Sequence, residues 1–204
     1  ATTVPLIIVV HPSVPAKSLR ELIALARARP AELNFGSSGP GTLSHLAGEL
    51  FKVMTKTDFV HVPYKGGGPA LIELLGGQVQ VTFNNILSAL PHVRAGKLRA
   101  LAVTGAQRSS AVPEVPTALE SGVADYVVLQ WNGFFAPIGT PRAVIARLNA
   151  EIDRALAEKE MRERLAGEGA EVGGGSPERL GAFVAAEYAK WGKVIRVAGI
   201  RGQD

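Results

Sequence analysis

The amino-acid sequence predicts an α/β fold built on a parallel, doubly wound sheet. Short apolar runs alternate with amphipathic stretches through the first two-thirds of the chain, and turns rich in glycine, proline or asparagine separate them. Repeated strand–helix units of this kind form parallel sheets with helices on both faces. The 204 residues are 47% hydrophobic and 20% charged, which is typical of a globular protein with a buried core.

Each element of the first hundred residues is indicated by its own pattern. The continuous apolar run at residues 6–10 is typical of a strand covered on both faces. Ser18 and Glu21 form an S-x-x-E capping box that opens a helix, and Pro69 suits the first position of another helix. The predicted strands are 6–10, 33–35, 59–62, 79–83 and 98–103, and the predicted helices run over about 18–29, 42–54, 69–75 and 86–95.

From about residue 109 the pattern changes to a loop, one apolar stretch and then helices. Residues 127–136 form the apolar stretch, Thr140 is expected to cap one helix, and Ser176 is expected to cap the last one. This part has too few strands to cover its own apolar faces. We therefore expect it to be half of a lobe whose other half precedes Ala1.

Three strand-to-helix turns carry residue types that bind anions without titrating. In a parallel sheet these turns share the carboxyl edge, where ligands of open α/β sheets bind. Free backbone N–H groups and the positive end of a helix dipole favour a carboxylate or a phosphate there. The candidate ligand-binding residues are Ser37, Ser38, Gly39, Gly41, Thr42, Ser44 and His45 in the first turn, Tyr64, Lys65, Gly66 and Gly67 in the second, and Asn84 in the third.

The same turns lack the groups that catalysis or metal binding requires. They contain no Asp or Glu for acid–base work, and the glycine-rich segment 36–42 lacks the lysine of a nucleotide-binding P-loop. The four histidines have no ligand spacing and the chain has no cysteine, so we expect no metal, no cofactor and no catalytic residue. The net charge of +4 is spread along the chain, which argues against nucleic acid as a partner.

Several motifs occur in a fixed order along the chain. They are Val9-Val-His-Pro-Ser-Val-Pro15, Ser44-His-Leu-Ala-Gly-Glu49, Val62-Pro-Tyr-Lys-Gly-Gly67, Gly76-Gly-Gln-Val79, Val115-Pro-Thr117, Arg147-Leu-Asn149 and Lys190-Trp-Gly-Lys193. Together they resemble the Bug family, the periplasmic receptors of tripartite tricarboxylate transporters. The resemblance spans essentially the whole chain. It implies a two-lobed periplasmic-binding-protein fold of type II, the Venus-flytrap architecture, with the first lobe incomplete in this chain.

The resemblance also implies a function. A family member would be a periplasmic, monomeric protein without enzymatic activity that captures a small organic carboxylate and presents it to membrane subunits of the transporter. Residues 10–125 would form the second lobe, and residues 1–9 and 126–204 a crossing strand and the C-terminal part of the first lobe. The family often has Asp where Asn84 stands, which disfavours amino acids as ligands.

Two other functions stay open at this point. One is an effector-binding domain of a transcription regulator, which shares the two-lobed fold. The other is an enzyme on the same scaffold, for which His45 and Lys65 form the only conceivable catalytic pair.

Overall fold

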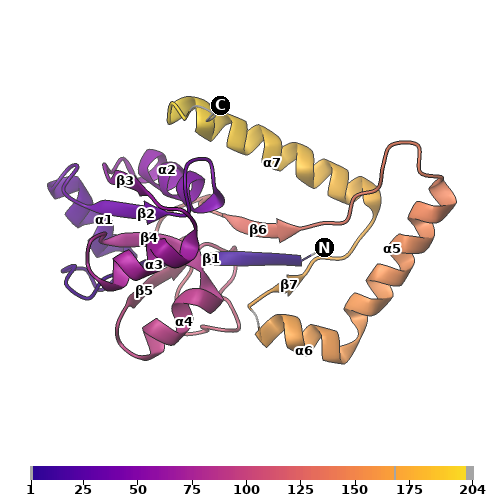
Figure 1. The fold of residues 1–204 in the computed structure, drawn as a ribbon, viewed down its shortest axis with the longest axis horizontal. Helices are drawn as coiled ribbons and strands as arrows, with labels where there is room; N and C mark the ends of the chain where they lie inside the picture. The colour runs from indigo at the N-terminus through magenta and orange to yellow at the C-terminus, as the bar shows by residue number, and fades with distance from the viewer. Residues whose placement is uncertain (1, 168, 201–204) are drawn as a thin grey trace.

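The computed structural model describes residues 2–167 and 169–200, so residues 1, 168 and 201–204 lie outside the described part of the chain. Figure 1 shows the order of the elements. The strands are β1 (Thr2–Val10), β2 (Asn34–Ser37), β3 (Val60–Pro63), β4 (Val81–Asn85), β5 (Arg99–Val103), β6 (Leu129–Asn132) and β7 (Glu171–Val172). The helices are α1 (Leu19–Ala28), α2 (Leu43–Thr55), α3 (Gly67–Leu75), α4 (Ile86–Arg94), α5 (Arg142–Ala157), α6 (Lys159–Gly167) and α7 (Pro177–Val197).

The larger sheet is mixed and not wholly parallel. Its strand order is β3-β2-β4-β1-β5, and β2 is parallel to both β3 and β4. β1 lies between β4 and β5 and is antiparallel to both of them. The prediction of a parallel sheet is therefore wrong for β1. A continuous apolar run shows that a strand is covered on both faces, but it carries no information about the direction of that strand.

β1 supplies the core on both faces of the larger sheet. Leu6, Ile8 and Val10 join an apolar cluster with residues of α1 and α2, whereas Ile7 and Val9 join a second cluster with residues of α3 and α4. All five of these side chains are at most 4% exposed. Since successive side chains of a strand point to opposite faces, an unbroken apolar run is what two covered faces require.

β1 also continues out of the larger sheet into a second, smaller one. Its first half, from Thr2 to Pro5, is antiparallel to β6, and Thr2 and Thr3 also pair with β7. The second half, from Leu6 to Val10, pairs with β4 and β5. The two sheets therefore divide between Pro5 and Leu6. The lobe boundary expected at residue 10 instead coincides with the end of β1.

Thr104 ties together the two segments that connect the sheets. Its Oγ1 accepts a hydrogen bond from the Leu6 N–H at 2.8 Å and donates to the Val128 carbonyl at 2.5 Å. Its backbone N–H donates to the Leu6 carbonyl, and its carbonyl accepts from the Val128 N–H, both at 2.9 Å. Thr104 is fully buried, so these bonds are shielded from water.

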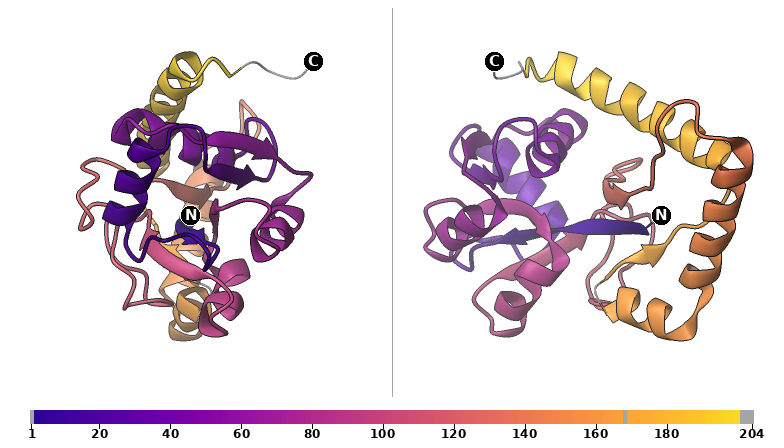
Figure 2. Two further views of the ribbon diagram at one scale, coloured as in Figure 1. Left: turned by 90° about the vertical axis from the view of Figure 1, so that its left-hand side faces the viewer. Right: turned by 45° about the vertical axis from the view of Figure 1, so that its right-hand side comes forward.

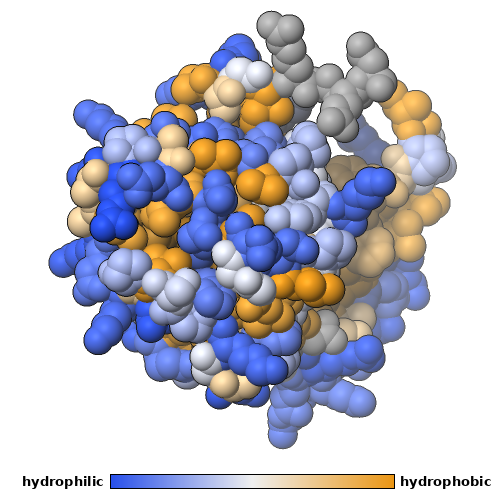
Figure 3. Space-filling model, turned by 60° about the vertical axis from the view of Figure 1, so that its left-hand side comes forward, coloured by the Kyte–Doolittle hydropathy of each residue, from blue (hydrophilic) through white to orange (hydrophobic). Residues whose placement is uncertain are grey.

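The C-terminal helices bury little of their surface. Every described side chain of α5 and α6 is at least partly exposed, and α7 buries only Val194. Figures 1 and 2 show α5 and α6 beside the smaller sheet, while α7 runs back toward α2. There Trp191 packs against the larger core. On the face shown in Figure 3, hydrophilic side chains surround small apolar islands. Within the described residues, no helix combines the length and apolarity that a membrane crossing needs.

Three helix starts were predicted from capping residues, and two are as expected. Ser18 accepts from the Glu21 N–H at 3.2 Å, and Ser176 accepts from the Arg179 N–H at 3.3 Å. Thr140 is not a cap, because α5 starts one residue later than predicted and the Thr140 hydroxyl donates to the Pro137 carbonyl. A cap position is set by one residue of register, which a sequence pattern does not resolve.

The hydroxyl of Thr82 is buried without a hydrogen-bond partner among the described residues. Such a group costs about 1–3 kcal/mol, because it loses its bond to water. We expect Thr82→Val, which keeps the shape of the side chain, to raise the free energy of unfolding by about 1 kcal/mol in urea denaturation. Thr104→Val is the matched control and is expected to destabilise, because its hydroxyl has partners. Destabilisation by both substitutions would contradict the account of Thr82.

Candidate functional site

A cavity of about 200 Å³ lies at the carboxyl edge of the parallel strands. The beginnings of α2, α3 and α4 meet there, so the three turns singled out in the sequence do converge. The cavity is lined by Ser38, Thr42, Leu43 and Ser44 of the first turn, Gly67 and Gly68 of the second, Asn84, Asn85 and Ser88 of the third, and Leu6, Phe83 and Gln130 of the strands. None of these residues carries a charge.

The first turn owes its shape to two glycines and a set of hydroxyl bonds. Gly39 and Gly41 have φ angles of 126° and 74°, a region that side-chain-bearing residues rarely adopt. The Thr42 hydroxyl donates to the Gly39 carbonyl at 2.7 Å, and Ser44 Oγ accepts from the Ser38 N–H at 2.9 Å. These bonds hold three hydroxyl groups beside the first turn of α2.

The second turn is fastened to the first. The Tyr64 N–H donates to the Ser37 carbonyl at 3.0 Å, and the Gly66 N–H donates to the Ser38 carbonyl at 3.1 Å. A Cβ atom added to Gly67 would lie 3.4 Å from Ser38 Oγ and 4.0 Å from Asn84 Oδ1. Gly67 is therefore the point at which all three turns approach one another.

The third turn presents an amide side chain to the cavity. Asn84 is 8% exposed, and its Oδ1 accepts from the Asn85 N–H at 2.9 Å. Asn85 caps α4, since its Oδ1 accepts from the Leu87 N–H at 2.9 Å. Among the described residues the Asn84 NH₂ group has no hydrogen-bond partner, so it remains a donor for a bound molecule.

The structure brings five of the twelve predicted site residues to the cavity, namely Ser38, Thr42, Ser44, Gly67 and Asn84. Ser37 and His45 are buried behind the turn, and Lys65 is exposed away from the cavity. Gly39, Gly41, Tyr64 and Gly66 shape the turns without lining the cavity. The sequence reasoning missed Leu6 and Gln130, because only the reversed direction of β1 and its pairing with β6 bring them to this edge.

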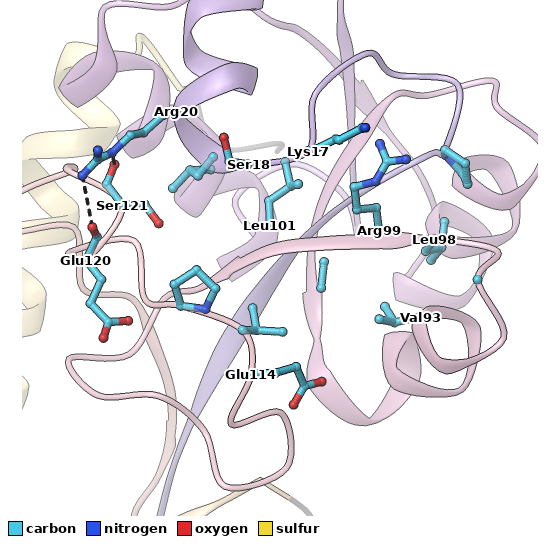
Figure 4. Close-up of a pocket in the computed structure, with 16 residues that line it drawn as sticks. Lys17, Ser18, Arg20, Val93, Leu98, Arg99, Leu101, Glu114, Glu120 and Ser121 are labelled. Atoms are coloured by element: carbon cyan, nitrogen blue, oxygen red, sulfur yellow. Dashed lines mark hydrogen bonds between the residues drawn. The ribbon is translucent and has the colours of Figure 1, made fainter.

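A larger hollow of about 670 Å³ lies at the opposite edge of the sheet (Figure 4). Two of the three cations that line it are bound to backbone carbonyls. Arg20 donates to the carbonyls of Ser121 and Glu120, and Arg99 donates to those of Val14 and Ala16, whereas Lys17 makes no such bond among the described residues. The hollow sits beside the start of β5, at the amino ends of the parallel strands. Because ligands of open α/β sheets bind at the carboxyl ends, we take the smaller cavity as the candidate site.

The wall of the cavity combines helix ends with uncharged side chains. The N-terminal ends of α2, α3 and α4 each place a positive partial charge near it. No carboxylate or imidazole lines it, so the cavity has no general acid or base. Neither His45 nor Lys65, the conceivable catalytic pair, reaches it. Within the described residues, no group of three possible ligands forms a metal site.

Two sheets are joined by crossing segments, and an uncharged cavity lies at the N-terminal ends of three helices. Solved periplasmic proteins share this fold. Rpa4515 of R. palustris with adipate is 41% identical at a TM-score of 0.85, covering 98% of this chain and 67% of that one. MatC from Rhodopseudomonas palustris with bound malate is 35% identical at a TM-score of 0.77, covering 95% and 67%. The periplasmic binding protein BugD is 31% identical at a TM-score of 0.79.

The sequence comparisons give the family. The model of the tripartite tricarboxylate transporter family receptor matches residues 1–200. BugT of Bordetella pertussis is 39% identical over 198 residues, which is 97% of this chain and 61% of BugT. The chain therefore belongs to the tripartite tricarboxylate transporter receptor family, whose members are periplasmic solute-binding proteins and not enzymes. It spans about 61% of the length of that curated relative.

Proposed function

We propose that this chain is the ligand-holding part of a periplasmic receptor that captures a small organic carboxylate for a tripartite transporter. The protein would act as a monomer and present the ligand to membrane subunits. The observation that carries the proposal is the uncharged cavity at which the N-terminal ends of α2, α3 and α4 meet. Three helix ends and their N–H groups can balance a carboxylate without a cationic side chain.

The ligand class that fits this wall best is a dicarboxylate without an ammonium group. The Ser38 hydroxyl and the amide of Asn84 can donate to a carboxylate or a hydroxyl group. The hydroxyls of Thr42 and Ser44 already donate within the turn, to the Gly39 carbonyl and to Ser38 Oγ. No carboxylate lines the wall, so an ammonium group would have no ionic partner here. Adipate and malate, which two of the similar structures contain, are dicarboxylates of this kind.

We also propose that the two sheets belong to two lobes with the cavity between them. Residues 6–125 would form one lobe, and residues 2–5 and 129–200 part of the other. Exposed apolar side chains in the segment after β6 support this, because Phe134, Phe135 and Ile138 are 72%, 70% and 105% exposed. Large apolar side chains that lie together on a surface are normally covered by other protein. The cover would be further polypeptide of the same protein.

A thermal-shift screen on the longest polypeptide that the gene encodes tests the ligand class. We expect dicarboxylates to raise the melting temperature, and amino acids and inorganic phosphate to leave it unchanged. A ligand at a hundred times its dissociation constant stabilises by about 2.7 kcal/mol, which is a shift of about 5–10 °C at this size. The proposed function would be refuted if phosphate alone raised the melting temperature, or if none of the carboxylates in the panel raised it.

The position of the ligand is tested by one added methyl group. Gly67→Ala puts a Cβ atom within 3.4 Å of Ser38 Oγ, at the point where the turns meet. We expect it to weaken dicarboxylate binding by about tenfold or more in titration calorimetry, which corresponds to about 1.4 kcal/mol. Gly181→Ala in α7 is the matched control, because its Cβ atom would meet nothing within 4 Å. Unchanged affinity in Gly67→Ala would place the ligand elsewhere.

A further inference from the structure

Two stacked imidazole rings lie behind the first turn of the cavity. His45 of α2 and His61 of β3 have ring centroids 3.8 Å apart and planes inclined by 10°. Phe35 of β2 also stacks on His61, with a centroid separation of 4.8 Å. His45 is 6% exposed, and neither histidine lines the cavity. Their contribution to the site must therefore pass through the turn that they touch.

Each imidazole binds one end of that turn. His45 Nδ1 accepts a hydrogen bond from the Gly41 N–H at 3.0 Å. His61 Nε2 shares a hydrogen bond of 2.6 Å with Ser37 Oγ, which in turn accepts from the Gly39 N–H at 3.1 Å. Since a backbone N–H only donates, His45 Nδ1 must carry no proton. The turn is thus held from behind at residues 37, 39 and 41, on either side of Ser38, which lines the cavity.

Burial keeps both rings neutral. Burial, together with smaller contributions from His45 and Lys52, lowers the pKa of His61 to about 4. Burial also lowers the pKa of His45, a change that Glu49 opposes and Lys52 reinforces. The charged groups facing the pair, Glu49 and Lys52, both lie on α2 and are paired with each other at 3.1 Å. A proton taken up by either ring would meet a second imidazole in van der Waals contact.

We propose that His45 and His61 are positioning residues for the ligand, and that protonation of His45 releases the turn and weakens carboxylate binding. The inference rests on the proposed function, because it concerns the same cavity. Protonated Nδ1 is a donor, so it repels the Gly41 N–H instead of accepting from it. Gly39 and Gly41 have wide conformational freedom, so a turn that loses this tether no longer fixes Ser38, Thr42 and Ser44. The receptor would therefore bind its ligand less tightly as the pH falls.

Two substitutions at one position separate positioning from packing. His45→Asn keeps an acceptor where Nδ1 lies and cannot take up a proton, whereas His45→Leu keeps bulk and has no acceptor. With adipate and malate as probes at pH 7.5, we expect His45→Leu to lose about tenfold or more in affinity and His45→Asn less than about threefold. Between pH 7.5 and 5, we expect the affinity of the wild type to fall more steeply than that of His45→Asn. His92→Asn is the control and should keep the wild-type pH profile.

Hydrogen exchange of the Gly41 amide in the unliganded protein provides a readout that needs no ligand. We expect protection in the wild type and in His45→Asn, and loss of protection in His45→Leu. Equal protection in all three proteins, or identical pH profiles in the wild type and His45→Asn, would overturn the positioning role. If no carboxylate binds the wild type while the exchange result is as expected, the proposed function fails and the tether of the turn stands.

Discussion

Gly48→Ala is expected to destabilise the protein by about 2 kcal/mol, although alanine normally favours a helix over glycine by about 1 kcal/mol. The added Cβ atom would lie 2.3 Å from Phe35 Cε2 and 2.8 Å from two other atoms of that ring. Phe35 is 1% exposed and sits between His61 and Phe83, so the ring has no room to move. Overpacking of a tight core costs about 1–3 kcal/mol, and three such contacts place this position at the upper end of that range. The helix-propensity gain of about 1 kcal/mol offsets part of this cost, which leaves a net loss of about 2 kcal/mol.

Urea denaturation of Gly48→Ala measures this effect, with Gly181→Ala as the reference. A Cβ atom on Gly181 meets nothing within 4 Å, so this variant is expected to gain up to about 1 kcal/mol from helix propensity. Because the Phe35 ring stacks on His61, Gly48→Ala should also loosen the ligand turn and weaken carboxylate binding. Stabilisation by both substitutions would mean that α2 and β2 are packed less closely than the structure shows.

Ile8→Ala is expected to cost about 2–5 kcal/mol of the free energy of unfolding. Ile8 has no exposed surface and lies in the interior strand β1, opposite Phe83 of β4 and Ala102 of β5. Domains are stable by only about 5–15 kcal/mol, so this one substitution removes a large share. The matched control is Ile72→Ala, at a position of α3 that is 66% exposed, and its effect should stay within about 0.5 kcal/mol. Equal losses of unfolding free energy for Ile8→Ala and its control, measured in urea, would contradict the burial of β1 in the core.

Sequence patterns predicted the elements of the larger sheet, and in most cases their limits to within two residues. They succeeded because the apolar periodicity of β1 and the capping box at Ser18 are local signals. They failed for the direction of β1, for the start of α5 at Arg142, and for the short strand β7. Strand direction and the pairing of a two-residue strand depend on contacts between distant segments, which no local pattern records.

The three turns predicted from the sequence meet at one edge of the sheet, where the structure has a cavity, but only five of the twelve predicted residues line it. Glycines, hydroxyls and asparagines at strand ends are visible in the sequence, and Ser38, Ser44 and Gly67 do line the cavity. His45 is buried behind the turn, where it stacks on His61 of β3, sixteen residues further along the chain. Gln130 comes from a strand that only the topology brings near. Both depend on the tertiary arrangement.

The hydrogen bonds of Thr104 to Leu6 and Val128 restrict where the two sheets could turn relative to each other. Since Leu6 and Val128 are bound to the same residue, rotation of the smaller sheet is limited to the torsion angles beyond them, at Pro5 and Leu129. The ring of Pro5 fixes its own φ angle, which leaves a narrow pivot. Gln130 lies just beyond this pivot and lines the cavity. A small rotation there would move Gln130 relative to the helix ends, and we expect it to change the size of the cavity.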